Sequence, residues 1–162
     1  MNKRKEIKIA SSLEEMFRVE QFVEEISDEY LLYNNYFGNI LMAVSEAVKN
    51  AIVHGNRMNG QKQVKITEEL STEGLWIRVF DEGDGFDFSK YSHPENFEKD
   101  VNPDKNGMLL IHNLADEVRF KNKGRLIEML FRINGIDDSI IQRRAALMHD
   151  FFRVFQRLNA PD

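Results

Sequence analysis

The sequence predicts an α/β (α+β) fold: a two-layer sandwich with helices on one face of a mostly antiparallel mixed sheet, plus an extra C-terminal helix. Two observations predict it. The expected elements run strand, helix, helix, strand, strand, helix, strand, strand, an order that favours helices segregated to one face of a sheet. The turns "STEG" and "NKG" are short enough to join antiparallel neighbours as hairpins. The 162 residues suffice for one domain with a substantial core.

The first third of the chain carries one strand and two helices. Lys5–Ala10 alternates in polarity, as a short strand does. Ser11 or Ser12 can then cap a helix over residues 13–29, where apolar residues recur at helical spacing. A second helix is predicted over residues 36–54. Its buried stripe is expected to comprise Phe37, Leu41, Val44, Val48 and Ile52.

The middle of the chain carries a hairpin, a long loop and a third helix. Strands are predicted over Gln63–Leu70 and residues 75–81. The glycine- and proline-containing stretch that follows has no period, and a loop of that length in a compact domain indicates function. A helix is then expected over residues 108–116, starting directly after Gly107, and two strands at "EVRFKN" and "RLIEMLFRI".

The segment from Asp137 is predicted to form a long helix. Its apolar stripe is wider than a solvated tail requires. Two interpretations stay open: the helix packs on its own domain, or it docks against a second copy or a partner. We therefore expect one domain over residues 1–134 and a helical extension over residues 135–162.

Composition excludes several classes of function. The net charge is −5 and no long basic cluster is present, which argues against nucleic acid as the main partner. The absence of cysteine excludes disulfides, thiolate catalysis and cysteine-based zinc sites. Neither a signal peptide nor a membrane span is predicted, because no continuous apolar run follows the basic start. We expect a cytoplasmic protein.

Polar groups on the second predicted helix suggest chemistry. Glu46, Asn50 and His54 are spaced by four residues and project from one side of the helix. On their own they would fit a solvated face. Asp81, however, ends a hydrophobic strand and opens "DEGDGF", where glycines let a backbone approach a ligand closely. A carboxylate there can accept a hydrogen bond from an exocyclic amine such as that of adenine.

The stretch "KNGMLLIHNL" supplies a candidate phosphate site. A helix starting after Gly107 would present unpaired N–H groups and a positive dipole end, with Lys105 beside them. Asn50 can offer an oxygen to Mg²⁺, which shares its ligands with phosphates. Glu46 can position or deprotonate an attacking hydroxyl. We expect His54 to cap or pack near its helix end.

These motifs, in this order, resemble those of the GHKL ATPase superfamily. "SEAVKNAIVHG" looks like its N-box, E-x-x-x-N-A-x-x-H-G, while "DEGDG" and "NGMLLIHNLADEV" are similar to its first and second glycine boxes. The best match is the branch of anti-sigma-factor serine kinases, over about residues 13–133. The resemblance implies a histidine-kinase-type ATPase fold with ATP and Mg²⁺ as cofactors.

The resemblance also implies a role for each matched position. Glu46 would be the catalytic base and Asn50 the Mg²⁺ ligand, while Asp81 would bind the adenine amino group. Residues 89–106 would form the ATP lid. The remaining cofactor-binding positions would be Gly83 and Gly85 in the base pocket, and Lys105, Gly107 and Met108 near the phosphates.

Members of this branch phosphorylate a serine of an anti-anti-sigma partner, sequester a sigma factor in the other state, and commonly form homodimers. The resemblance implies the same here. The chain departs from the family pattern where Lys105 replaces the first glycine of the second box and Arg125 replaces threonine in the third. These departures motivate an alternative, a non-catalytic nucleotide-gated protein-binding module.

Overall fold

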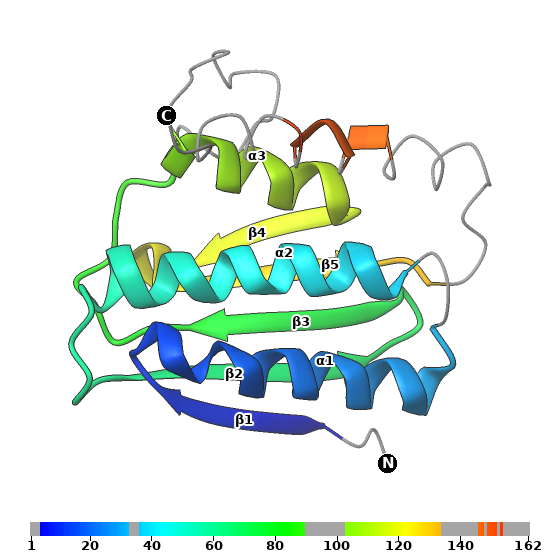
Figure 1. Ribbon diagram of the computed structural model, residues 1–162, viewed down its shortest axis with the longest axis horizontal. Helices are drawn as coiled ribbons and strands as arrows, with labels where there is room; N and C mark the ends of the chain where they lie inside the picture. Colours follow the sequence, from blue (N-terminus) through cyan, green and yellow to red (C-terminus); the bar gives the residue numbers. More distant parts are fainter. Residues whose placement is uncertain are drawn as a thin grey trace.

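The structure of the protein is a computed structural model. It describes residues 4–32, 36–89 and 103–133, together with residues 146–147, 149–151 and 153 near the C-terminus. Three helices and five strands make up the main body (Figure 1). In chain order they are β1 (Lys5–Ala10), α1 (Met16–Tyr30), α2 (Phe37–Asn50), β2 (Gln63–Leu70), β3 (Leu75–Phe80), α3 (Pro103–Leu114), β4 (Glu117–Lys121) and β5 (Leu126–Phe131).

The five strands form one sheet in the order β1-β2-β3-β5-β4, and every pairing is antiparallel. The predicted fold class is confirmed. Because β3 and β5 pair antiparallel, the end of β3 meets the start of β5: Phe80 pairs with Leu126. This register places the residues that follow β3 next to the turn that precedes β5.

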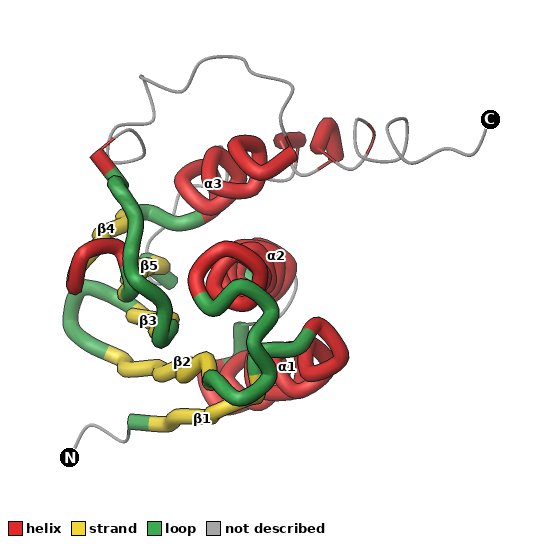
Figure 2. The backbone as a smooth tube through the Cα atoms, turned by 90° about the vertical axis from the view of Figure 1, so that its left-hand side faces the viewer, coloured by secondary structure: helices red, strands yellow, loops and turns green. Residues whose placement is uncertain are grey.

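The three helices cover one face of the sheet, as the edge-on view in Figure 2 shows. Val44, Val48 and Ile52 of the predicted stripe are fully buried, whereas Phe37 and Leu41 are partly buried and pack against the same core. Alternate residues of the strands, such as Ile66, Ile77 and Met129, complete the core from the sheet side. The hydrophobic layer between helices and sheet holds the fold together.

The first two helices begin close to where the sequence predicts. The Ser12 hydroxyl accepts a hydrogen bond from the Glu14 N–H at 3.3 Å, and a 3₁₀ turn, Leu13–Glu15, leads into α1. The prediction of a serine cap is confirmed.

The end of α2 differs from the prediction, because the chain does not continue as an α-helix to His54. The next residues, Ala51–Gly55, form a π-helical turn, closed by an Asn56 N–H to Ala51 C=O bond of 2.8 Å.

The third helix starts earlier than predicted. It begins at Pro103, so Gly107 lies within α3 and not immediately before it. The prediction that Gly107 immediately precedes the helix is therefore wrong. Proline suits the first helical position, because it has no N–H to leave unpaired and its φ is already helical. Residues 90–102 of the expected lid lie outside the described residues.

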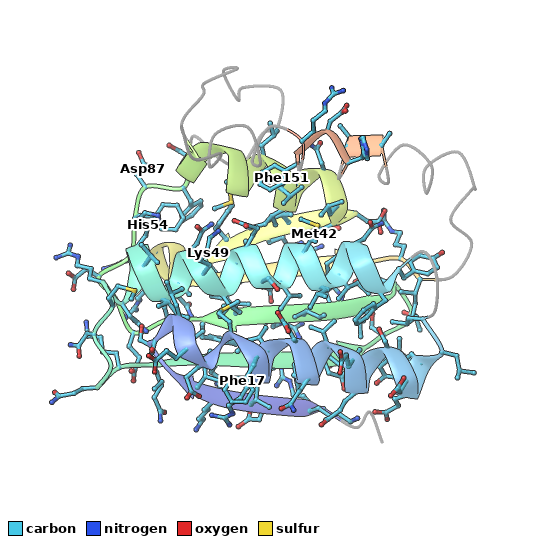
Figure 3. All side chains as sticks on the ribbon, in the orientation of Figure 1. Phe17, Met42, Lys49, His54, Asp87 and Phe151 are labelled. Atoms are coloured by element: carbon cyan, nitrogen blue, oxygen red, sulfur yellow. The ribbon has the colours of Figure 1, made fainter. Side chains whose placement is uncertain are left out.

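The described part of the C-terminal segment contacts the domain itself. Phe151 is partly buried and packs against the hydrophobic core. Met42 of α2, labelled with Phe151 in Figure 3, is also partly buried and packs against this core. This contact favours packing in cis at Phe151, whereas most of the predicted helix, residues 134–145 included, lies outside the described residues. Among the described helices, none is long and apolar enough to span a membrane.

Candidate functional site

A cavity of about 370 Å³ opens where α2, α3 and the adjacent ends of β3 and β5 meet. Four of the residues predicted as site residues line it: Asn50, Asp81, Gly85 and Met108. Its other lining is mostly apolar. These further lining residues are Ala47, Ala51, His54, Gly55, Val79, Phe86, Ile111, Phe120, Gly124, Arg125 and Ile127.

Asp81 brings a carboxylate to this mostly apolar cavity. It follows β3 directly, and its own N–H donates to the Arg125 carbonyl at 3.0 Å, which continues the β3–β5 pairing by one residue. Its Oδ1 accepts a hydrogen bond from the Gly83 N–H at 2.8 Å. Burial raises the pKa of Asp81, while the Gly83 N–H and the charges of Arg125 and Lys62 oppose the rise.

Gly55 lets the end of the π-helical turn approach Asp81. A Cβ at Gly55 would lie 2.5 Å from Asp81 Cγ and 2.6 Å from Oδ2, closer than real Cβ atoms come to other groups. Gly83, in turn, packs its Cα against the Gly55 carbonyl. The turn at the end of α2 and the glycines after β3 therefore form one wall of the cavity. π-helical turns of this kind are frequent at functional sites.

Asn56 holds this wall together, and sequence reasoning missed it. Its side chain is buried, with 1% exposed. The Oδ1 atom accepts from the Glu82 N–H at 2.8 Å, and Nδ2 donates to the Gln63 carbonyl at 2.9 Å. One amide thus ties the end of α2 to the start of β2 and to the loop after β3. Its position directly after "HG" is the signal that could have identified it.

Glu46 and Gly107 form a second contact, beside the cavity. Glu46 Oε2 lies 2.6 Å from the place that a Cβ would occupy at Gly107, and Asn50 Nδ2 lies 3.9 Å from it. Lys49 Nζ holds the other oxygen, Oε1, at 3.1 Å. Figure 3 shows Lys49 and His54 on the side of α2 that faces α3. The N-box residues and the second glycine box, far apart in sequence, therefore meet in space.

Phe86 and Phe120 form an aromatic wall that the sequence did not predict. Both line the cavity, and their ring centroids lie 5.7 Å apart in an edge-to-face arrangement. Gly124 permits this wall, because its φ is +86° and a Cβ there would lie 2.7 Å from the Phe86 ring. Phe86 remains 43% exposed. An aromatic face at the mouth of a cavity can stack on a planar ring.

Chemically, the arrangement combines a carboxylate in a mostly apolar pocket with a second carboxylate and an amide nearby. The pocket suits a flat heterocycle with an amine for Asp81. Within the described residues no three His, Cys, Asp or Glu side chains cluster as a metal site. Asn50 carries an amide oxygen, a kind of ligand that Mg²⁺ can share with phosphates. The side chain of Lys105 lies outside the described residues.

The results of comparison with known proteins agree with this geometry. The model of the histidine kinase-like ATPase domain matches residues 9–131. That match covers most of the chain, so the chain belongs to the histidine kinase-like ATPase family. The resemblance predicted from the N-box and glycine boxes is confirmed.

Among curated proteins the chain is similar to serine-protein kinases named RsbW. It is 31% identical to the one from Bacillus subtilis (strain 168) over 104 residues, covering 60% of this chain and 65% of the relative. It is 35% identical to that of Staphylococcus aureus (strain Newman) over 96 residues, covering 54% and 60%. The chain therefore spans somewhat less than two thirds of the length of the curated relatives it matches.

Proposed function

We propose that the protein binds ATP in the cavity and transfers its γ-phosphoryl group to a serine of a protein partner. The observation that carries the proposal is the contact between Glu46 and Gly107, next to Asn50 and beside the Asp81 cavity. It supports an arrangement in which one end of the site recognises a base and the other offers a carboxylate to the reacting groups. The relatives named as serine-protein kinases support the same reaction.

In this proposal Asp81 accepts a hydrogen bond from the adenine amine, and Phe86 stacks on the ring. Glu46 accepts the proton of the attacking serine hydroxyl. The serine oxygen bonds to the γ-phosphorus while the bond between that phosphorus and the bridging oxygen breaks. ADP leaves with the electron pair of the broken bond. Lys49 holds one Glu46 oxygen, which leaves the other directed at Gly107.

Mg²⁺, when bound, would neutralise phosphate charge during transfer. Asn50 fits the role of its protein ligand, because the residue lines the cavity one helical turn after Glu46 and carries an amide oxygen. Gly107 and Met108 of α3 would lie near the phosphates, together with Lys105. Gly83 and Gly85 would shape the base pocket.

The partners in this proposal follow from the resemblance of the N-box and glycine boxes to those of anti-sigma-factor serine kinases. The phosphorylated serine belongs to an anti-anti-sigma protein, and the chain sequesters a sigma factor in the alternate state. It acts in the cytoplasm as a homodimer. Residues 1–134 form the ATP-binding unit, and residues 135–162 extend it.

The test is phosphotransfer from labelled Mg-ATP to the cognate anti-anti-sigma protein. Wild type is expected to label its partner, and Glu46→Ala to reduce the rate at least about 100-fold, the scale of general-base catalysis. ADP affinity measured by calorimetry should stay close to that of wild type in the variant. A wild type that binds ADP but never labels its partner would contradict the kinase assignment.

A second candidate is a non-catalytic, nucleotide-gated binding module. The feature that favours it is Arg125, which lines the cavity where the family pattern has threonine. Such a module would change its affinity for the partner between ADP and ATP without turnover. Partner binding measured in each nucleotide, with product analysis by mass spectrometry, separates the two: gating without phosphoserine identifies the module.

A further inference from the structure

Arg125 is an exposed residue whose backbone pairs with that of Asp81. Its carbonyl accepts the Asp81 N–H at 3.0 Å, and its guanidinium Nε donates to the Asn122 carbonyl at 3.2 Å. The residue also lines the cavity. Its side chain is therefore anchored at one N–H, while the remaining guanidinium donors stay available for other groups.

The charge of Arg125 acts on the side of the cavity that carries the buried carboxylate. Burial raises the pKa of Asp81, and after the Gly83 N–H the positive charge of Arg125 is the main influence that lowers it. Lys62 acts in the same direction, although it does not line the cavity. Arg125 is thus a cation that lowers the pKa of Asp81 and also lines the cavity that a ligand would fill.

A purine offers more than an amine to such a pair. An ionised Asp81 can only accept hydrogen bonds, whereas the ring nitrogens on either side of the adenine amine, N1 and N7, need a donor. A guanidinium can only donate. A carboxylate and a guanidinium from two residues that line the same cavity can match an amine and a neighbouring ring nitrogen, and leaving that nitrogen without a partner in an apolar pocket would cost affinity.

We propose that Arg125 is a base-recognition residue, which donates a hydrogen bond to N1 or N7 of the adenine ring whose amine Asp81 binds. The proposal rests on the proposed nucleotide site. It assigns a function to the position where the chain departs from the family pattern. The departure then alters how the base is recognised and leaves the rest of the site unchanged.

The experiment is calorimetry with three ligands, ADP, 1-deaza-ADP and 7-deaza-ADP, on wild type, Arg125→Met and Arg125→Lys. Arg125→Met is expected to weaken ADP about 10- to 100-fold, the range for a hydrogen bond to a charged group. Arg125→Lys, which keeps a donor, should recover part of the loss. One deaza ligand should bind wild type as weakly as ADP binds Arg125→Met, and this variant should not distinguish that ligand from ADP.

Lys62→Met is the matched control, because it removes the other positive charge acting on Asp81 without changing the cavity lining. It should leave ADP affinity within about twofold of wild type. Pyrophosphate binding tests general attraction of anions, and Arg125→Met should leave it unchanged. Thermal unfolding of each variant checks that it folds; if Arg125→Met does not, the deaza ligands on wild type and Arg125→Lys decide.

Each of the following results would overturn the inference and leave the nucleotide site standing. The Arg125→Met variant binds ADP as tightly as wild type does, or Lys62→Met and Arg125→Met lose the same ADP affinity. Equal losses of affinity for ADP and both deaza ligands in Arg125→Met would have the same consequence. Wild type that binds both deaza ligands as tightly as ADP would overturn it as well. Failure of wild type to bind ADP at all would instead remove the nucleotide site and the proposed function with it.

Discussion

At the scale of single residues, Gly55 and Asp81 approach each other closely in the site. They come from different elements, and no side chain fits between them, since a Cβ at Gly55 would lie 2.5 Å from the Asp81 carboxylate carbon. The carboxylate thus depends on a hydrogen atom at position 55 for its place in the cavity. Space, not backbone conformation, makes glycine necessary there.

Gly55→Ala should therefore displace Asp81 and weaken ADP binding at least about 10-fold, because the hydrogen bond to the base would lose its alignment. Gly60→Ala is the matched control, since a Cβ there meets nothing within 4 Å. Calorimetry measures both. If Gly55→Ala bound ADP as well as Gly60→Ala does, Asp81 would not be the residue that holds the base.

At the scale of elements, Tyr30 connects the end of α1 to β2. Its hydroxyl donates to the Glu68 carboxylate, with O–O distances of 3.3 Å and 3.2 Å, and Glu68 is fully buried. Burial, and then the charge and hydrogen bond of Glu68, raise the pKa of Tyr30 to about 12. Burial also raises the pKa of Glu68. The pair is a polar contact within the hydrophobic layer.

Tyr30→Phe should lower the free energy of unfolding at pH 7 by about 1–3 kcal/mol, because Glu68 loses a donor while buried. The tyrosine is neutral in both folded and unfolded chains below pH 10. Its contribution is then lost as the pH rises from about 10, where the unfolded chain ionises, through about 12.

Urea unfolding at pH 7, 9 and 11 measures the difference between wild type and Tyr30→Phe. The difference should be constant from pH 7 to 9 and smaller at pH 11. A difference that does not change with pH would show that Tyr30 titrates normally in the folded protein.

The elements also show how far the sequence alone could lead. Apolar residues spaced by three or four positions located α1 and α2. Alternating polarity located β1, and both β1 and β2 were predicted at their observed bounds. The π-helical turn leaves no mark in such a pattern, since its residues are as apolar as those of a regular turn. The start of α3 was missed because residues 103–106 lack a buried stripe in sequence, although Pro103 was a usable signal.

The candidate site also contains residues that the sequence could predict and residues that it could not. Glu46, Asn50 and Asp81 could be found because a motif fixes their spacing along the chain. Phe86 and Phe120 could not, since their contribution depends on which strands pair, whereas Asn56 was missed although it directly follows "HG". Phe120 is opposite Ile127 in the β4–β5 hairpin, and it reaches the cavity beside Asp81 because β5 also pairs with β3. Pairing between strands distant in sequence is not encoded in any local pattern.

At the scale of the whole molecule, the two faces of the sheet differ in what holds them. The face under the helices is apolar, whereas the opposite face carries ion pairs across strands. Arg78 bonds Glu69 at 2.8 Å and Glu128 at 2.9 Å, and Lys121 lies 3.0 Å from Glu128. Burial alone would raise the pKa of Glu128, but hydrogen bonds from Arg78 and Lys121 lower it below its usual value.

Arg78→Met should lower the free energy of unfolding at pH 7 by about 1–3 kcal/mol, because the Glu128 side chain is only 7% exposed and loses its closest partner. A carboxyl group with a lowered pKa stabilises the folded state above its unfolded pKa of about 4.3 and loses that contribution as the pH falls below it. The difference between wild type and Arg78→Met should therefore shrink from pH 6 to pH 3.

Chemical denaturation at pH 6, 4.5 and 3 provides the measurement. Arg4→Met serves as a comparison, since Arg4 contacts the same Glu69 at 3.7 Å from a side chain that is 54% exposed. It should change stability by less than about 0.5 kcal/mol. Equal effects of the two substitutions would mean that the cross-strand network adds nothing beyond a surface ion pair.

We propose that the cavity between α2, α3 and the adjoining ends of β3 and β5 binds a nucleotide through Asp81. Titration of wild type and Asp81→Asn with ADP tests it most directly. Wild type should bind one ADP per chain, and Asp81→Asn should bind at least about 10-fold more weakly while remaining folded. Absence of ADP binding to wild type, or equal binding by the two proteins, would contradict the claim.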